Sequence, residues 1–145
     1  RQNPYVSFLP YTRRLTCEIA PDLFDDFDLI VDAVDNQETR RLIAATAEEL
    51  GLPVVSGAIT QWEGQVTIWD PAFGGPSYAS IFPKDPQAGL APSCAEAGVV
   101  GSLPGIIGSI MATEAIKRIT GAGKPLIGEM IIYDALDAET RKIKL

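Results

Sequence analysis

Hydrophobic residues recur along this chain in short runs separated by polar turns, and their spacing alternates between that of strands and that of helices. Residues 28–34 (DLIVDAV) are almost continuously apolar, which is typical of a strand buried on both faces of a parallel sheet. Asp35 and Asn36 follow, and either side chain can cap the first turn of a helix. Apolar residues then return at helical spacing until Gly51, a favoured helix stop, and residues 53–58 (PVVSGA) predict the next strand. This order predicts a right-handed βαβ unit.

The remaining strand signals are short. Residues 5–10 (YVSFLP) and 65–69 (QVTIW) combine β-branched and aromatic side chains, so each predicts a strand. Residues 130–133 (MIIY) and 140–145 (TRKIKL) flank a turn and predict an antiparallel pair. We therefore expect one α/β domain over residues 1–145, with a mixed sheet that is parallel in its first half and antiparallel in its second.

Two further segments carry the remaining pattern. Residues 70–97 are rich in Pro, Gly, Ser and Ala, and so long a connection is either a functional crossover loop or a disordered insertion. A helix is expected to begin near Ser102, and one face of it carries only small residues. We expect that face to pack tightly on the sheet, with a subunit interface as the alternative. The small residues are Gly101, Gly105, Gly108, Ala112 and Ala115.

Composition narrows the class of protein. The net charge is −7 and no basic run occurs, which argues against nucleic acid as a partner. Two cysteines and no histidine provide neither a disulfide framework nor a histidine-based metal site, so a reducing cytoplasmic setting is expected. The longest apolar stretch, residues 97–113, is shorter than the roughly 20 residues of a membrane span and is read as a buried helix. The chain begins with Arg1 rather than Met, which suggests a fragment or a processed product.

Two side chains stand out as candidate chemical groups. Asp35 follows an apolar strand, where a carboxylate can hold Mg²⁺ beside phosphates, although a helix cap is the simpler interpretation. Cys94 precedes the helix near Ser102, and a helix N-terminus lowers the pKa of a thiol. The alternative is an inert buried cysteine, and the nearby Glu96 would oppose the thiolate.

Two motifs that would indicate zinc binding or phosphate binding do not occur in this sequence. Ser77 and Ser80 occupy positions where a Cys-x-x-Cys pair would suit a glycine-rich turn, and serine hydroxyls are poor zinc ligands. We therefore expect no zinc. No GxGxxG or Walker A phosphate loop occurs in the 145 residues, so most of a cradle for ATP phosphates is absent from them.

Taken together, the motifs resemble those of the ThiF/MoeB/HesA group of E1-like activating enzymes, and the resemblance covers essentially the whole chain. Asn3 and Pro4 match the family's "NP" before a strand. The matching blocks are residues 31–40 (VDAVDNQETR), 53–69 (PVVSGAITQWEGQVTIW), 74–83 (GGPSYASIFP), 92–117 (PSCAEAGVVGSLPGIIGSIMATEAIK) and 123–136 (GKPLIGEMIIYDAL).

The resemblance implies a Rossmann-like fold and ATP-dependent adenylylation of the C-terminal glycine of a ubiquitin-like sulfur carrier of the MoaD/ThiS type, in molybdopterin or thiamin biosynthesis. It implies that Asp35 lies near Mg·ATP, that Asn36 and Arg40 shape the nucleotide site, and that Cys94 is the cysteine that links covalently to the carrier in some members. A homodimer is also expected. The chain matches the C-terminal portion of such an enzyme, with the nucleotide loop expected upstream of Arg1.

Two other functions are weighed against this one. A non-catalytic module that binds the carrier or forms a dimer would explain the missing phosphate loop and cysteine pair. A related ATP-dependent dehydratase acting on modified tRNA is disfavoured by the net charge of −7.

Overall fold

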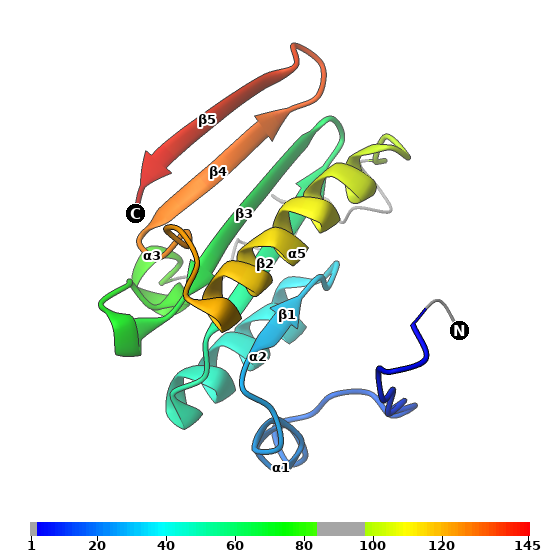
Figure 1. The fold of residues 1–145 in the computed structure, drawn as a ribbon, viewed down its shortest axis with the longest axis vertical. Coiled ribbons are helices and arrows are strands. Elements are labelled where there is room, and N and C mark those ends of the chain that lie inside the picture. The colour runs from blue at the N-terminus through cyan, green and yellow to red at the C-terminus, as the bar shows by residue number, and fades with distance from the viewer. Residues whose placement is uncertain (1–2, 84–97) are drawn as a thin grey trace.

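The computed structural model describes residues 3–83 and 98–145 and shows a five-stranded mixed sheet with helices on both faces (Figure 1). The strand order is β1-β2-β3-β4-β5; β1 pairs in parallel with β2, and every later pair is antiparallel. The expected mixed α/β sheet is therefore confirmed, with its parallel part reduced to one pair. The strands are β1 (Ile30–Asp32), β2 (Val54–Thr60), β3 (Glu63–Trp69), β4 (Glu129–Asp134) and β5 (Glu139–Lys144).

The predicted βαβ unit is present as β1, helix α2 (Gln37–Leu50) and β2. Asn36 is the N-cap of α2, and its Oδ1 accepts a hydrogen bond of 2.9 Å from the backbone N–H of Thr39. Gly51 ends the helix with a φ of 69°, a left-handed conformation that glycine adopts at little cost. Local capping signals thus set both ends of α2.

Helix α5 (Leu103–Thr120) crosses one face of the sheet, over β2 and β3 (Figure 1). Leu103, Ile107 and Met111 fill the core on this side. The close approach depends on glycines in the sheet: a Cβ at Gly57 would overlap the Met111 side chain, and one at Gly64 would overlap Ile107.

Most of the small-residue face of α5 does not pack on the sheet, so the expectation that the whole face does is wrong; of its five residues only Ala115 is partly buried against the core. Gly101, Gly105, Gly108 and Ala112 are exposed, and a Cβ added at any of these three glycines would meet nothing within 4 Å. Large apolar side chains gain more from burial than glycine or alanine, so the face with isoleucine, leucine and methionine turns inward. The helix is therefore half-buried rather than fully buried.

The opposite face of the sheet is covered by α1 (Ala20–Phe24), α2 and α3 (Tyr78–Ile81). Its core includes Trp69 and Tyr78, whose rings meet edge to face with centroids 5.5 Å apart. Helix α3 and the 3-10 helix η1 (Pro71–Phe73) lie within residues 70–83, so this part of the expected loop has secondary structure of its own.

Two strand predictions need correction. Residues 5–10 form no strand; their side chains are exposed, because no described strand lies beside them to accept their backbone hydrogen bonds. β1 covers only three residues of the predicted run and is an edge strand, so Val31 remains 53% exposed rather than buried on both faces.

Among the described residues, no helix is long and apolar enough to cross a membrane.

Candidate functional site

A cavity of about 690 Å³ opens where β1 and β2 end, and it is here named the strand-end cavity. Its walls come from the turn after β1, from the paired ends of β2 and β3, and from the first turns of α5. Ligands of open α/β sheets bind beyond the carboxyl ends of the strands, and this volume suits a small molecule or a peptide tail. The residues that line it include Val34, Asp35, Asn36, Arg40 and Gly57.

Asp35 and Asn36 both line this cavity. Both are exposed, and Asn36 Nδ2 donates to Asp35 Oδ1 at 3.4 Å. Asn36 therefore serves as the helix cap, which leaves the carboxylate of Asp35 accessible to a ligand. The capping interpretation therefore applies to Asn36, and the role of Asp35 in a nucleotide site stays a prediction.

Arg40 has a different environment. It is 7% exposed, and its Nη1 pairs with Asp32 Oδ2 at 2.8 Å and donates to Ser56 Oγ at 2.7 Å. Ser56 Oγ in turn donates to Asp32 Oδ2 at 2.8 Å, which closes a triangle of buried polar groups. We call Asp32, Arg40 and Ser56 the buried clamp.

The other guanidinium nitrogen of Arg40 holds backbone. Nη2 donates to the carbonyl oxygens of Val34 and Gly57, each at 2.8 Å. Asp32 Oδ1 accepts from the N–H of Val34 at 3.1 Å. The buried clamp therefore joins β1, β2 and α2 directly behind the strand-end cavity.

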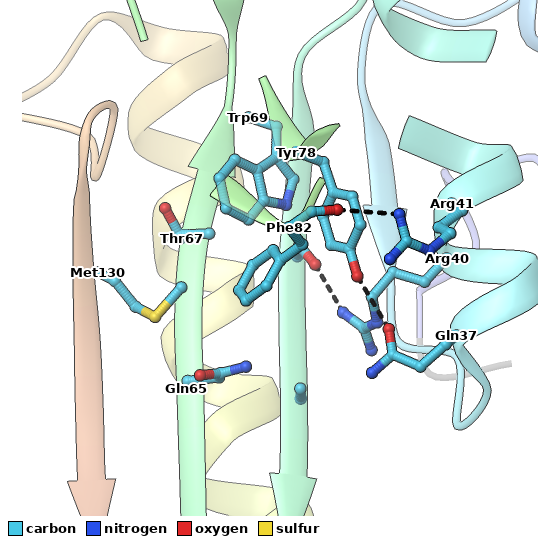
Figure 2. A pocket seen from close by; sticks show the side chains of 11 residues that line it. Gln37, Arg40, Arg41, Gln65, Thr67, Trp69, Tyr78, Phe82 and Met130 are labelled. Atoms are coloured by element: carbon cyan, nitrogen blue, oxygen red, sulfur yellow. Dashed lines mark hydrogen bonds between the residues drawn. The ribbon is translucent and has the colours of Figure 1, made fainter. Parts of the chain in front are cut away.

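A second, smaller cavity of about 180 Å³ lies on the α2 face of the sheet, among the rings of Trp69, Tyr78 and Phe82 (Figure 2). Figure 2 shows the Tyr78 ring beside Gln37 and Arg41 of α2: Tyr78 Oη donates to Gln37 Oε1 at 2.8 Å, and Arg41 Nη1 donates to the carbonyl of Phe82 at 2.9 Å. The two cavities are adjacent, because they share four lining residues, Gln37, Arg40, Ala58 and Gln65.

The remaining predicted positions do not join this site. Cys94 lies outside the described residues. Ser77 caps α3, with its Oγ accepting from the N–H of Ser80 at 3.2 Å, and Ser80 Oγ donates back to the Ser77 carbonyl at 2.8 Å. Within residues 3–83 and 98–145, no group of three or more His, Cys, Asp or Glu side chains could hold a metal. The absence of zinc stays a prediction.

Asp32 and Ser56 are members of the buried clamp that the sequence pattern did not single out. One signal was available for Asp32, a carboxylate inside an otherwise apolar strand. A buried charge is tolerated only with a partner, so such a position predicts a cation nearby. Ser56 offered no comparable signal, because a small hydroxyl is ordinary in a strand.

The model of the ThiF family matches residues 1–145. The chain belongs to the ThiF family. It is 49% identical over 97% of its length to the sulfur carrier protein adenylyltransferase of Thermus thermophilus, and covers 54% of that protein. It is 41% identical to the probable adenylyltransferase/sulfurtransferase MoeZ of Mycobacterium tuberculosis, with 99% of the chain and 37% of MoeZ covered. The chain thus spans about half or less of these ThiF-family relatives.

Solved structures agree at the level of the fold. E. coli MccB superimposes with a TM-score of 0.69 at 12% identity, covering 90% of this chain and 42% of MccB. PaaA superimposes with a TM-score of 0.63 at 19% identity, covering 89% of this chain and 46% of PaaA. At these identities the likeness establishes the arrangement of the sheet and its helices, and the site is argued from the residues of this chain.

Proposed function

We propose that the full-length protein carrying this sequence adenylylates the C-terminal glycine of a ubiquitin-like sulfur carrier of the MoaD/ThiS type. A carboxylate oxygen of the carrier would attack the α-phosphorus of ATP. The bond from that phosphorus to the bridging oxygen of the β-phosphate breaks, and pyrophosphate leaves. The product is an acyl adenylate at the carrier's C-terminus.

The observation that carries the proposal is the strand-end cavity with Asp35 exposed on it, in a chain of the ThiF family. The strand-end cavity shares four lining residues with the second cavity, so the two cavities lie next to each other. A flexible peptide tail can enter a cavity of this size, whereas a compact domain cannot. The relatives named as sulfur carrier adenylyltransferases support the same substrate class.

The residues also suit Mg²⁺, which binds proteins through one or two carboxylates and completes its shell with water and substrate phosphates. Asp35 is an exposed carboxylate on the cavity, so it would hold the ion beside ATP. The ion supplies positive charge that offsets the charge developing on the phosphates. Asn36 contributes by capping α2 and donating to Asp35, and Arg40 contributes through the backbone that it holds.

The finer features of the proposal are a cytoplasmic homodimer and a role in molybdopterin or thiamin biosynthesis. The name of the Xenopus laevis relative, adenylyltransferase and sulfurtransferase MOCS3, 38% identical over 99% of this chain, supports a sulfur-transfer context. The exposed small-residue face of α5 is compatible with a second copy packing closely.

An ATP–pyrophosphate exchange assay tests the proposal. The full-length protein should exchange label only when a carrier with its C-terminal glycine is present. The matched control is the same carrier with that glycine deleted, which should abolish exchange. Absence of exchange with both MoaD-type and ThiS-type carriers would contradict the proposal.

A second candidate function follows from one sequence fact, the lack of a glycine-rich phosphate loop in these 145 residues. The chain by itself would then be a carrier-binding or dimerisation module. Binding of an intact carrier by the isolated chain, together with no exchange by the full-length protein, would favour the module over the enzyme.

A further inference from the structure

We propose that Arg40 is a positioning residue, which acts with Asp32 and Ser56 to fix the place of the Asp35 carboxylate in the strand-end cavity. The inference rests on the proposed adenylylation and names how the site for it is held. Arg40 lines the cavity but is only 7% exposed, and its guanidinium is already bound to four protein oxygen atoms, so we assign it a positioning role rather than contact with the transferred group.

The orientation of the guanidinium is set from one side. Asp32 Oδ2 and Ser56 Oγ lie 2.8 and 2.7 Å from Nη1. Asp32 is 1% exposed and Ser56 4% exposed, so water does not compete for these contacts. Charge-assisted hydrogen bonds in a water-excluded place are short and directional, which gives the arginine one orientation.

From its other side, the guanidinium holds the turn that carries Asp35. Nη2 binds the carbonyl oxygen of Val34, which belongs to the peptide group joining Val34 to Asp35. The N–H of Val34 is bound in turn by Asp32 Oδ1. Both polar groups of Val34 are therefore tied to members of the buried clamp.

The following residue is held as well. Asn36 caps α2 through its side chain, and its carbonyl accepts from the backbone N–H of Arg40 at 3.2 Å. Asp35 thus lies between two residues with fixed backbone, while its own side chain is exposed. The side-chain carboxylate of Asp35 is therefore in contact with solvent, whereas the backbone of Asp35 is held in place by its two neighbours.

The free-energy cost of burying the Arg40–Asp32 ion pair favours a positioning role over a role in stability alone. Desolvating an ion pair costs free energy that its Coulomb attraction often only balances, so apolar side chains would serve stability equally well. Apolar side chains could not bind the Val34 carbonyl, however. A displacement of about 1 Å in a reacting group can cost on the order of 100-fold in rate, so a fixed carboxylate has a direct consequence for the reaction.

The test is a double-mutant cycle in the full-length protein, read by exchange kinetics. Arg40→Lys keeps the charge but cannot bind Asp32 and both carbonyls together, so kcat should fall roughly tenfold with KM for ATP and carrier changed less than about twofold. Asp35→Asn should lower kcat by roughly 100-fold. In the Asp35→Asn background, Arg40→Lys should change kcat by less than about twofold, because its effect acts through Asp35.

Arg118→Lys is the matched control. Arg118 also pairs with a buried carboxylate, Asp70, at 2.7 Å, but it lines neither cavity. It should lower the melting temperature as Arg40→Lys does and leave kcat unchanged. If Arg40→Lys does not fold, Ser56→Ala replaces it, with a kcat loss of roughly threefold that also vanishes in the Asp35→Asn background.

The outcomes separate the two proposals. Equal losses from Arg40→Lys with and without the Asp35 carboxylate, or an equal kcat loss in Arg118→Lys, would overturn the positioning role while leaving adenylylation intact. Full exchange by Asp35→Asn would also overturn it. No exchange by the unmodified protein with either carrier would instead contradict the proposed function.

Discussion

Gly64 of β3 lies directly beneath Ile107 of α5, so closely that a Cβ on the glycine would overlap Cγ1 and Cδ1 of the isoleucine. Gly57 and Met111 repeat the relationship one strand away. These two contacts set the distance between α5 and the sheet, and both pairs also line the strand-end cavity. The residues that pack the helix on the sheet are therefore also part of the cavity wall.

Replacing Gly64 by alanine should destabilise the fold by about 1–3 kcal/mol, because Ile107 is buried and its β-branched side chain has little freedom to turn aside. Gly57→Ala should cost less, since Met111 is flexible. Urea unfolding gives both values.

Gly108→Ala is the matched control for these two variants. Gly108 lies in α5 with open space around it, so alanine should raise the free energy of unfolding by roughly 0.5–1 kcal/mol. Equal stability for Gly64→Ala and the unmodified chain would show that α5 does not pack as described.

The ion pair between Arg118 and Asp70 predicts a second difference in stability. Asp70 is 1% exposed, and Arg118 also lies over the Phe73 ring at 4.1 Å. Arg118→Ala leaves that carboxylate buried without its cation, so we expect a loss of about 3 kcal/mol. Lys142 pairs with Glu129 at 2.9 Å on the surface, and Lys142→Ala should cost at most about 1 kcal/mol. Thermal unfolding of both variants compares the pairs; similar losses would contradict the burial argument.

Asn36 separates a capping role from a role in the nucleotide site. Asn36→Ala removes the acceptor for the Thr39 N–H and should destabilise by about 1 kcal/mol. Asn36→Asp keeps a cap acceptor and should retain stability, but it places a second carboxylate beside Asp35 and should lower ATP–pyrophosphate exchange. Unchanged exchange by Asn36→Asp would mean that Asn36 is a cap only.

Cys94 lies outside the described residues, and its role is a prediction from sequence. A thiolate at this position would attack the carbonyl of the acyl adenylate, form a thioester and release AMP. Cys94→Ser should abolish a carrier adduct that appears on a non-reducing gel and disappears with dithiothreitol. Cys17 is exposed and supplies the control, since Cys17→Ser should retain the adduct. An adduct that persists in Cys94→Ser would make Cys94 structural.

Much of the fold could be predicted because its signals are local. The cap at Asn36, the stop at Gly51 and the turn between residues 130–133 and 140–145 each depend on a few neighbouring residues, and each produces the predicted element. The end of the apolar run at residue 34 predicted that Asp35 and Asn36 share the turn between a strand and a helix. The structure shows that this turn lines a cavity.

Two predictions that the structure contradicts, a strand at residues 5–10 and a small-residue face of α5 packed on the sheet, failed for the same physical reason. Residues 5–10 have the composition of a strand, but a strand forms only where a neighbour accepts its hydrogen bonds. The small-residue stripe on α5 indicated close packing, yet the glycines that permit close packing belong to β2 and β3. In both cases the deciding contact comes from a residue distant in the sequence.

The sequence by itself determined the family, the βαβ unit, the antiparallel end of the sheet and the turn that presents Asp35. Only the tertiary structure decided which face of α5 is buried, and only it brought Asp32 and Ser56 to Arg40. Caps, turns and periodicity are properties of adjacent residues and can be read along the chain. A buried charge is held in place by partners from other elements, so its role becomes visible only when the chain is folded.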